Sequence, residues 1–195
     1  MGRLPTRTLA VASLAVVAAT AAIELWMGRL PLGPDGRFGW WETDIWSAAM
    51  SQRFADPYSF SHILHGVIFY AALWLTARGA PLSTRALGAI LLEGAWEILE
   101  NSPIIINRYR EVTMALGYEG DSVLNSMGDV VMMAIGFGLA ARLRLWQSLA
   151  FVALVELVML ALLRDNLTLN ILMLLYPIDA IRDWQMAAAP VPLPG

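Results

Sequence analysis

Cysteine is absent from this chain of 195 residues, and charged residues make up only 15% of it, against about 25% in an average soluble domain. The missing cysteine excludes disulfide bonds, zinc–thiolate centres and thiol nucleophiles. The shortage of charge accompanies an excess of apolar residues, 58% of the chain, gathered in runs of about 20 residues, the length that crosses a bilayer. The shortage of charge and the length of the apolar runs favour a single integral membrane domain.

Basic runs with interleaved aromatic residues are also absent, and the formal net charge is -3. Nucleic acid is therefore not an expected partner, because its binding needs a basic surface. The sequence contains no complete metalloprotease or P-loop motif and no G-x-S-x-G elbow. These motifs would each have indicated a reaction, so the sequence by itself names none.

Five apolar runs predict an all-α fold, a polytopic transmembrane helical bundle in contact with membrane lipids. A further run, Leu167–Ile181, is short for a crossing, so a sixth span and a re-entrant or surface helix are equal alternatives. One domain is expected over residues 1–186, followed by a disordered Pro-rich tail at 187–195. The five expected spans are Thr8–Met27, Phe60–Ala77, Arg85–Glu100, Asp121–Ala141 and Trp146–Leu163.

Interfacial segments are expected between the spans. The first span resembles a secretory signal, but its apolar run is longer than a typical signal core, which favours an uncleaved helix. Residues 28–56 contain several tryptophans and predict an interfacial helix or lid, since tryptophan prefers the headgroup level. Ser102 followed by Pro103 is typical of a helix start, and predicts a surface helix over Ile104–Leu116.

Arginines in the short loops set the expected orientation. They gather on one side of the predicted bundle, and such loops are usually cytoplasmic. The prediction is a multi-pass protein of a bacterial inner membrane, with its N-terminus in the cytoplasm and the Trp-rich loop facing the periplasm. The arginines that carry this prediction are Arg3, Arg7, Arg78, Arg85, Arg142 and Arg144.

Ionisable residues inside the spans converge on the predicted outer face. Glu93, Glu97 and Glu100 are spaced by four and three residues, so they share one face of a helix. Matching depths in antiparallel spans predicts Glu100 near Asp121, Glu97 near Asn125, and Glu93 near Asp129. Charge is costly in hydrocarbon, so such residues are functional candidates. The candidate catalytic pocket, open to the periplasm, comprises His62, His65, Glu97, Glu100, Asp121 and Asn125.

Two chemistries suit this set. Imidazoles and carboxylates bind divalent metals such as Zn, Mn or Fe, and the candidate ligands are His62, His65, Glu97 and Asp121. Without a metal, apposed carboxylates suit acid–base work or proton carriage. A phosphate headgroup would need basic partners, for which the candidates are Arg108, Arg110 and Arg164.

Plainer interpretations compete with these functional ones. Glu24, near the end of the first span, is expected to reach water. Glu93 and Asp129 are deep enough to be bonded to each other as a link between helices. Glu156 is expected to be neutral or paired with Arg164.

Several segments carry a family resemblance, among them D-P-Y-S-F-S-H-I-L-H-G, W-E-I-L-E-N-S-P-I-I-I-N-R-Y-R-E and R-D-N-L-T-L-N-I-L-M-L-L. Through them the chain resembles a bacterial family of uncharacterised inner-membrane proteins, of the UPF type with a domain of unknown function. The resemblance implies a multi-pass plasma-membrane protein and no particular activity. A looser resemblance to VanZ-like proteins rests on Asp121, Asn125 and Gly128, but Met132 stands where that pattern continues with glycine.

Three classes of function remain open on the sequence. The first is a membrane-embedded enzyme or binder that acts on lipid or cell-envelope precursors. The second is a proton-coupled transporter using Glu93, Asp129 and Glu156, and the third is an assembly protein without chemistry.

Overall fold

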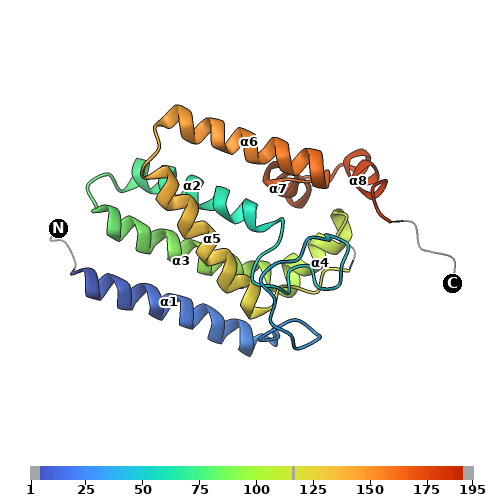
Figure 1. Cartoon of the computed structure of the whole chain (residues 1–195), viewed down its shortest axis with the longest axis horizontal. Coiled ribbons are helices and arrows are strands. Elements are labelled where there is room, and N and C mark those ends of the chain that lie inside the picture. The colour runs from blue at the N-terminus through green and yellow to red at the C-terminus, as the bar shows by residue number, and fades with distance from the viewer. Residues whose placement is uncertain (1–4, 116, 191–195) are drawn as a thin grey trace.

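The computed structural model describes residues 5–115 and 117–190. This part of the chain folds into eight helices without a strand, which confirms the all-α prediction (Figure 1). Arg3, Leu116 and the last five residues of the predicted tail lie outside the described residues. The helices are α1 (Thr6–Trp26), α2 (Ser59–Thr76), α3 (Leu82–Glu100), α4 (Pro103–Val112), α5 (Val123–Ala140), α6 (Leu145–Leu163), α7 (Leu167–Leu175) and α8 (Asp179–Met186).

Four helices, α1, α2, α5 and α6, are long and apolar enough to cross a membrane. The α6 helix shows why: Leu154, Leu157 and Leu162 are 60% or more exposed, as a lipid-facing surface requires. The fifth long helix, α3, has 19 residues but carries four charged ones. It packs against α1, α2 and α5, so its acids lie inside the bundle instead of facing lipid.

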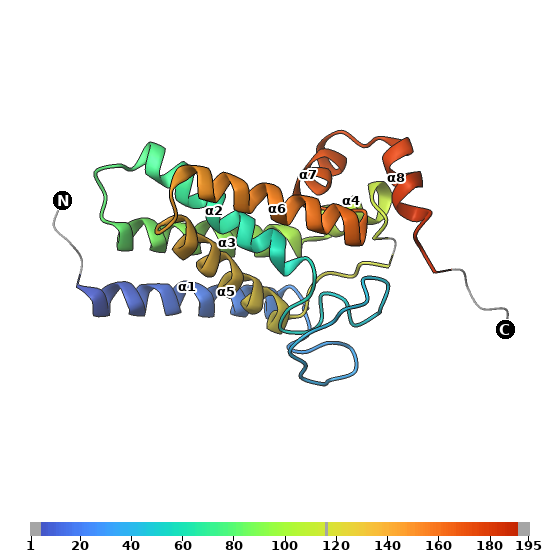
Figure 2. The same cartoon turned by 45° about the horizontal axis from the view of Figure 1, so that its top comes forward.

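The run at 167–181 forms short helices and not a sixth span. The α7 helix has nine residues, about 14 Å at 1.5 Å per residue, roughly half of the hydrocarbon thickness. Together with α4 and α8 it lies at one end of the long helices (Figures 1 and 2). The loop at 27–58 covers the same end, which we call the capped end.

The Trp-rich part of that loop is not helical, so the predicted interfacial helix is wrong and only the lid alternative remains. Its polar side chains bind the loop's own backbone, which competes with helix formation. Glu42 accepts the N–H groups of Thr43 and Asp44, and Asp44 accepts the N–H of Trp46. The predicted surface helix does form as α4, starting at Pro103.

Glycines bring α2 and α5 into backbone contact. A Cβ atom on Gly66 would lie 2.0 Å from the Met133 carbonyl oxygen, and one on Gly136 would lie 1.9 Å from that of Ile63. Only glycine permits such an approach, as in other membrane helix pairs. The contact positions the histidine-bearing start of α2 between α3 and α5.

The half of the bundle away from the cap is apolar. Ala89, Met133 and Phe137 form a buried cluster there, and Phe69 and Leu73 pack against it. A hollow of about 690 Å³ opens at this end between α1, α3 and α5, with Arg142 at its edge. The ionisable residues singled out inside the spans are absent from its lining.

Candidate functional site

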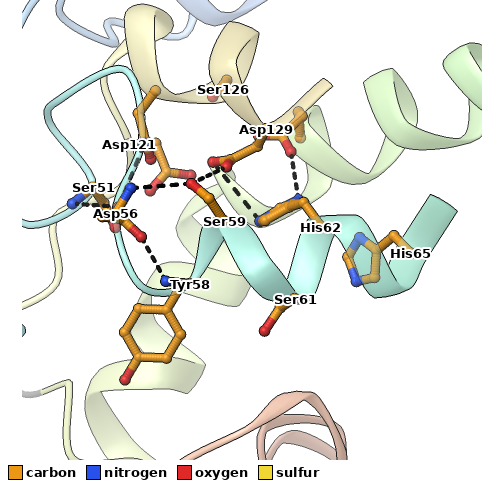
Figure 3. Close-up of polar contacts among 12 residues, drawn as sticks. Ser51, Asp56, Tyr58, Ser59, Ser61, His62, His65, Asp121, Ser126 and Asp129 are labelled. Atoms are coloured by element: carbon orange, nitrogen blue, oxygen red, sulfur yellow. Dashed lines mark hydrogen bonds and ion pairs between the residues drawn. The ribbon is translucent and has the colours of Figure 1, made fainter. Parts of the chain in front are cut away.

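His62 joins three helices near the capped end. It is the fourth residue of α2, and its Nδ1 lies 2.6 Å from Glu93 Oε1 and 3.4 Å from Glu97 Oε1, both on α3. Its Nε2 lies 3.8 Å from an oxygen of Asp129 on α5. Figure 3 shows the Asp129 side chain between His62 and Ser59, whose hydroxyl donates to it at 2.8 Å.

His65 extends this arrangement by one helical turn. Its Nδ1 lies 3.2 Å from Glu93 Oε2, so Glu93 sits between two imidazole rings. Trp96 and Phe69 flank the ring, with centroids 5.8 and 5.7 Å from it. We call the whole set the charged centre, which consists of His62, His65, Glu93, Glu97, Glu100 and Asp129.

Two acids of the charged centre have carboxyl oxygens without a hydrogen-bond donor, Glu97 at both oxygens and Glu100 at one. Glu97 is completely buried, yet neither of its carboxyl oxygens has a hydrogen-bond partner among the described residues. One oxygen of the half-buried Glu100 is in the same state. Buried polar groups in proteins are nearly always bonded, so these oxygens need an explanation.

A second group of buried acids lies beside the charged centre, among the segments of the capped end, which we call the cap. Asp56 accepts the N–H groups of Tyr58 and Ser51, at 2.7 and 3.2 Å. Asp121 accepts from the Tyr118 hydroxyl at 3.0 Å and from the Asn101 amide at 3.2 Å. The Asp56 bonds hold the loop that enters α2 in shape, and the Asp121 bonds connect the loop that enters α5 to the end of α3.

Asp165, between α6 and α7, is the third acid of this group. It accepts from the Asn166 N–H, the Gln185 and Asn170 amides and the Tyr58 hydroxyl. Burial raises its pKa to about 6 and that of Asp56 to about 6, and it also raises the pKa of Asp121. We call Asp56, Asp121 and Asp165 the cap acids.

The structure divides the predicted pocket between these two groups. His62, His65, Glu97 and Glu100 lie in the charged centre, whereas Asp121 and Asn125 belong with the cap acids. The side chains are packed against one another and do not line an open pocket. The metal-compatible groups of the described chain are His62, His65 and Glu93, and His62, Glu97 and Glu100, so the choice of Asp121 as a ligand is not supported.

In the predicted pairing of α3 with α5, Glu100 lies close enough to Asp121 for their charges to interact, as expected, but the other two pairs differ in detail. Asn125 donates to the Arg53 carbonyl and to Asp56, and not to Glu97. Glu93 and Asp129 are not bonded to each other, because His62 stands between them. The prediction compared the depths of residues in α3 and α5 alone. It did not consider the start of α2, which lies between these two helices.

The three candidate phosphate-binding arginines hold the cap together. Arg108 donates to the Leu174 carbonyl at 3.0 Å, Arg164 to the Trp184 carbonyl at 2.9 Å, and Arg110 to the Tyr118 carbonyl. Each guanidinium therefore links separate segments of the cap. These contacts do not bring the three side chains to a common anion site.

Comparison with known proteins places the chain in a family. Residues 24–187 match the family described as "Protein of unknown function (DUF2585)". The chain belongs to this family. It is 52% identical to a UPF0314 protein of Sphingopyxis alaskensis, covering 92% of this chain and 96% of the relative. A UPF0314 protein of Paracoccus denitrificans is 48% identical, covering 90% of this chain and 91% of the relative.

The expected UPF-type family is thus confirmed, while the VanZ-like resemblance is not shown. A UPF0314 protein of Agrobacterium fabrum is 49% identical over 83% of the chain and 81% of the relative. No solved structure matches the chain significantly. The family names carry no activity, so the function of this DUF2585 protein has to be argued from its site.

Two acids of this DUF2585 protein lie in surroundings that the sequence did not predict. Glu24 was expected to reach water but is completely buried, because α1 packs against α3 and α5. Glu156 was expected to be neutral or paired with Arg164, but it accepts the N–H groups of Leu167 and Thr168 at the start of α7. It acts as a cap for that helix.

Three residues that hold the site in place were not singled out from the sequence. Asp56 precedes a proline directly before α2, which is a signal for a helix start that could have identified it. Asn101 ends α3, and its amide donates to Asp121 and Ser126. Asp165 offered no comparable signal, because its partners come from four separate positions of the chain.

Proposed function

We propose that this DUF2585 protein is an inner-membrane protein, with its capped end in the periplasm, whose charged centre binds or transforms the polar part of a lipid or cell-envelope precursor. The observation that carries the proposal is Glu97, a fully buried acid beside His62 whose carboxyl oxygens have no donor among the described residues. Glu24 is also buried without donors among these residues, but only Glu97 belongs to a group of imidazoles and carboxylates. Leaving such a group unsatisfied costs stability, which favours a purpose other than folding.

The depth of the charged centre supports this class of substrate. His62 lies three residues inside α2, and Glu93 lies seven residues before the end of α3. At 1.5 Å per residue these depths are about 5 and 10 Å. A bilayer leaflet contributes about 15 Å of hydrocarbon, so helices that end at its boundary would hold the centre in the outer two thirds of that leaflet, below the glycerol esters.

The chemistry of the centre fits a headgroup as well. Carboxyl oxygens without donors are acceptors for the hydroxyl or amino groups that headgroups carry, or for a water molecule. The centre is closed in this structure, so a headgroup reaches Glu97 only after the half-buried side chains of His65 and Glu100 move aside. The two imidazoles are fixed in place by Glu93, and Trp96 beside His65 supplies an apolar wall. Such fixed groups orient a bound molecule at no cost in reorganisation.

Transport receives less support from the structure. Glu156, one of the three candidate proton carriers, is bound to the backbone of α7. Below the charged centre, Met133, Phe137 and Ala89 are buried and apolar, and a proton path would have to cross them. Proton flux into liposomes that contain the protein, abolished by Glu93→Gln, would nevertheless establish transport.

The test compares membrane lipids and lipid-linked precursors by mass spectrometry in three strains: wild type, a deletion strain, and one with Glu97→Gln at the native locus. We expect at least one such species to change several-fold in both the deletion and the variant, with normal amounts of protein. Glu111→Gln, an exposed acid on α4, is the matched control and should resemble wild type. A normal lipid profile in the Glu97→Gln strain would contradict the proposal.

A further inference from the structure

We infer that the charged centre binds one divalent transition-metal ion, with His62, His65, Glu93 and Glu97 as ligands. The inference rests on the proposed function for the role of the ion, because the ion would be the part of that site that contacts the substrate. Its binding can be tested without knowing the substrate.

The ligand atoms form two groups within 4.8 Å that share His62, one with His65 and Glu93 and the other with Glu97 and Glu100. A single site with four ligands joins these groups through His62, and it requires the Glu97 side chain to turn toward His65 and Glu93. In a tetrahedral site with ligands at 2.0–2.2 Å, neighbouring ligand atoms lie about 3.3–3.6 Å apart. His62 Nδ1 is 3.4 Å from Glu97, and His65 Nδ1 is 3.2 Å from Glu93. The 2.6 Å between His62 and Glu93 has to open by less than about 1 Å, which a side-chain rotation provides.

The unpartnered Glu97 is the independent observation that points to a cation. Its exposed fraction is 0%, and His62 Nδ1 lies 3.4 Å from its Oε1. A neutral hydrogen-bond network would have supplied a donor to each of its oxygens, as the cap acids show. A cation between Glu97 and the imidazoles satisfies both groups at once.

The charged centre contains more acid than its imidazoles can pair. It has four carboxyl groups, on Glu93, Glu97, Glu100 and Asp129, and two imidazoles. Imidazoles that bind a metal are neutral, so a divalent ion pairs with two of the four carboxylates. The other two, Glu100 and Asp129, need hydrogen bonds or protons, because buried charge is costly unless it is paired.

The ligand types select the class of metal. Imidazole nitrogens with carboxylate oxygens suit Zn²⁺, Mn²⁺ and Fe²⁺, whereas Mg²⁺ and Ca²⁺ prefer oxygen ligands alone. Asp129 faces the Nε2 side of His62 and is itself held by the Ser59 hydroxyl. A carboxylate in this place orients a metal-bound histidine, so Asp129 is a positioning residue.

The experiment measures metals in the detergent-purified protein by elemental mass spectrometry, using an affinity tag without histidine. We expect close to one transition-metal ion per chain, and a loss of at least tenfold in His65→Gln and Glu97→Gln. Glu24→Gln is the matched control, because Glu24 is equally buried and also lacks hydrogen-bond partners among the described residues but lies outside the charged centre. Metal-free wild-type protein, or an equal loss in Glu24→Gln, would overturn the inference.

A second measurement covers variants that fold poorly. Wild-type protein freed of metal by a chelator should gain several degrees in Tm on addition of excess Zn²⁺ or Mn²⁺, but not Mg²⁺, because a ligand bound only to the folded state stabilises it. Glu93→Gln should abolish this gain and Glu100→Gln should retain it. The reverse pattern would assign the ion to the other group, His62, Glu97 and Glu100, and would contradict the choice of Glu93 as a ligand.

These results separate the two proposals. Stoichiometric metal in wild type together with a normal lipid profile in Glu97→Gln cells would support the metal site and overturn the proposed function. A changed lipid profile with metal-free protein would do the opposite, and would leave protonated acids as the arrangement in the charged centre.

Discussion

The cap acids and Glu97 of the charged centre are all buried but differ in what surrounds them. Asp165 is 5% exposed and accepts four hydrogen bonds from backbone and side-chain donors. Glu97 is 0% exposed and accepts none among the described residues. Burial alone therefore does not identify a functional acid in this protein. The lack of donors does not identify one alone either, because Glu24 shares it, but Glu97 also lies beside His62 and the other acids of the charged centre.

The difference has a physical origin in the elements that carry the acids. The cap acids lie in loops next to helix starts, where free N–H groups are abundant. The acids of α3 lie within a helix, whose N–H groups are already bonded to its own carbonyls. An acid in a helix can be satisfied only by other side chains, a ligand or an ion, which makes α3 the suitable place for a site.

Removing a cap acid should have the largest effect on stability. Asp165→Ala leaves the Tyr58 hydroxyl, two side-chain amides and one N–H without their acceptor. We expect the free energy of unfolding to fall by about 3–5 kcal/mol, measured by thermal unfolding in detergent. Asp183→Ala, at an exposed position of α8, is the control. A small change in Asp165→Ala would remove the distinction between the two groups.

The α2–α5 contact should matter next, because it positions His62 beside α3 and α5. In Gly66→Ala the new methyl group would meet the Met133 carbonyl at 2.0 Å, so one helix must move. We expect a loss of about 1–3 kcal/mol. Gly88→Ala, whose Cβ would meet only the Leu73 side chain at 3.5 Å, should be neutral or slightly stabilising. Equal Tm values for the two variants would show that α2 and α5 can separate at little cost.

Protonation of the cap acids should have a smaller effect on stability, and its sign follows from their pKa values. Asp56 and Asp165 have folded-state pKa values of about 6, above the ordinary 3.8. Between pH 3.8 and about 6 the folded state therefore binds more protons than the unfolded state. The free energy of unfolding should fall as pH rises from about 4 to 6.5, by the order of 1–3 kcal/mol. In Asp165→Asn the Tm should depend less on pH over this range. A wild-type Tm that rises with pH there would contradict the assignment.

The sequence predicted the long helices well, because their apolar runs are long and their ends carry clear signals. The start of α4 at Pro103 and the shared face of Glu93 and Glu97 both followed from local rules. The predictions that failed concern contacts between residues far apart in the chain. Glu24 is buried by α3 and α5, and Asn125 is bound to a loop some 70 residues away in the chain. Local periodicity contains no information on such pairs.

The most direct test of the account is the Tm of Glu97→Gln measured in the presence of a chelator. The substitution keeps the shape of the side chain and removes a buried carboxyl group that no donor among the described residues stabilises, so we expect a Tm equal to or above that of wild type under the same conditions. A fall as large as that of Asp165→Ala would show that Glu97 holds the fold together, and would contradict its assignment to a functional site.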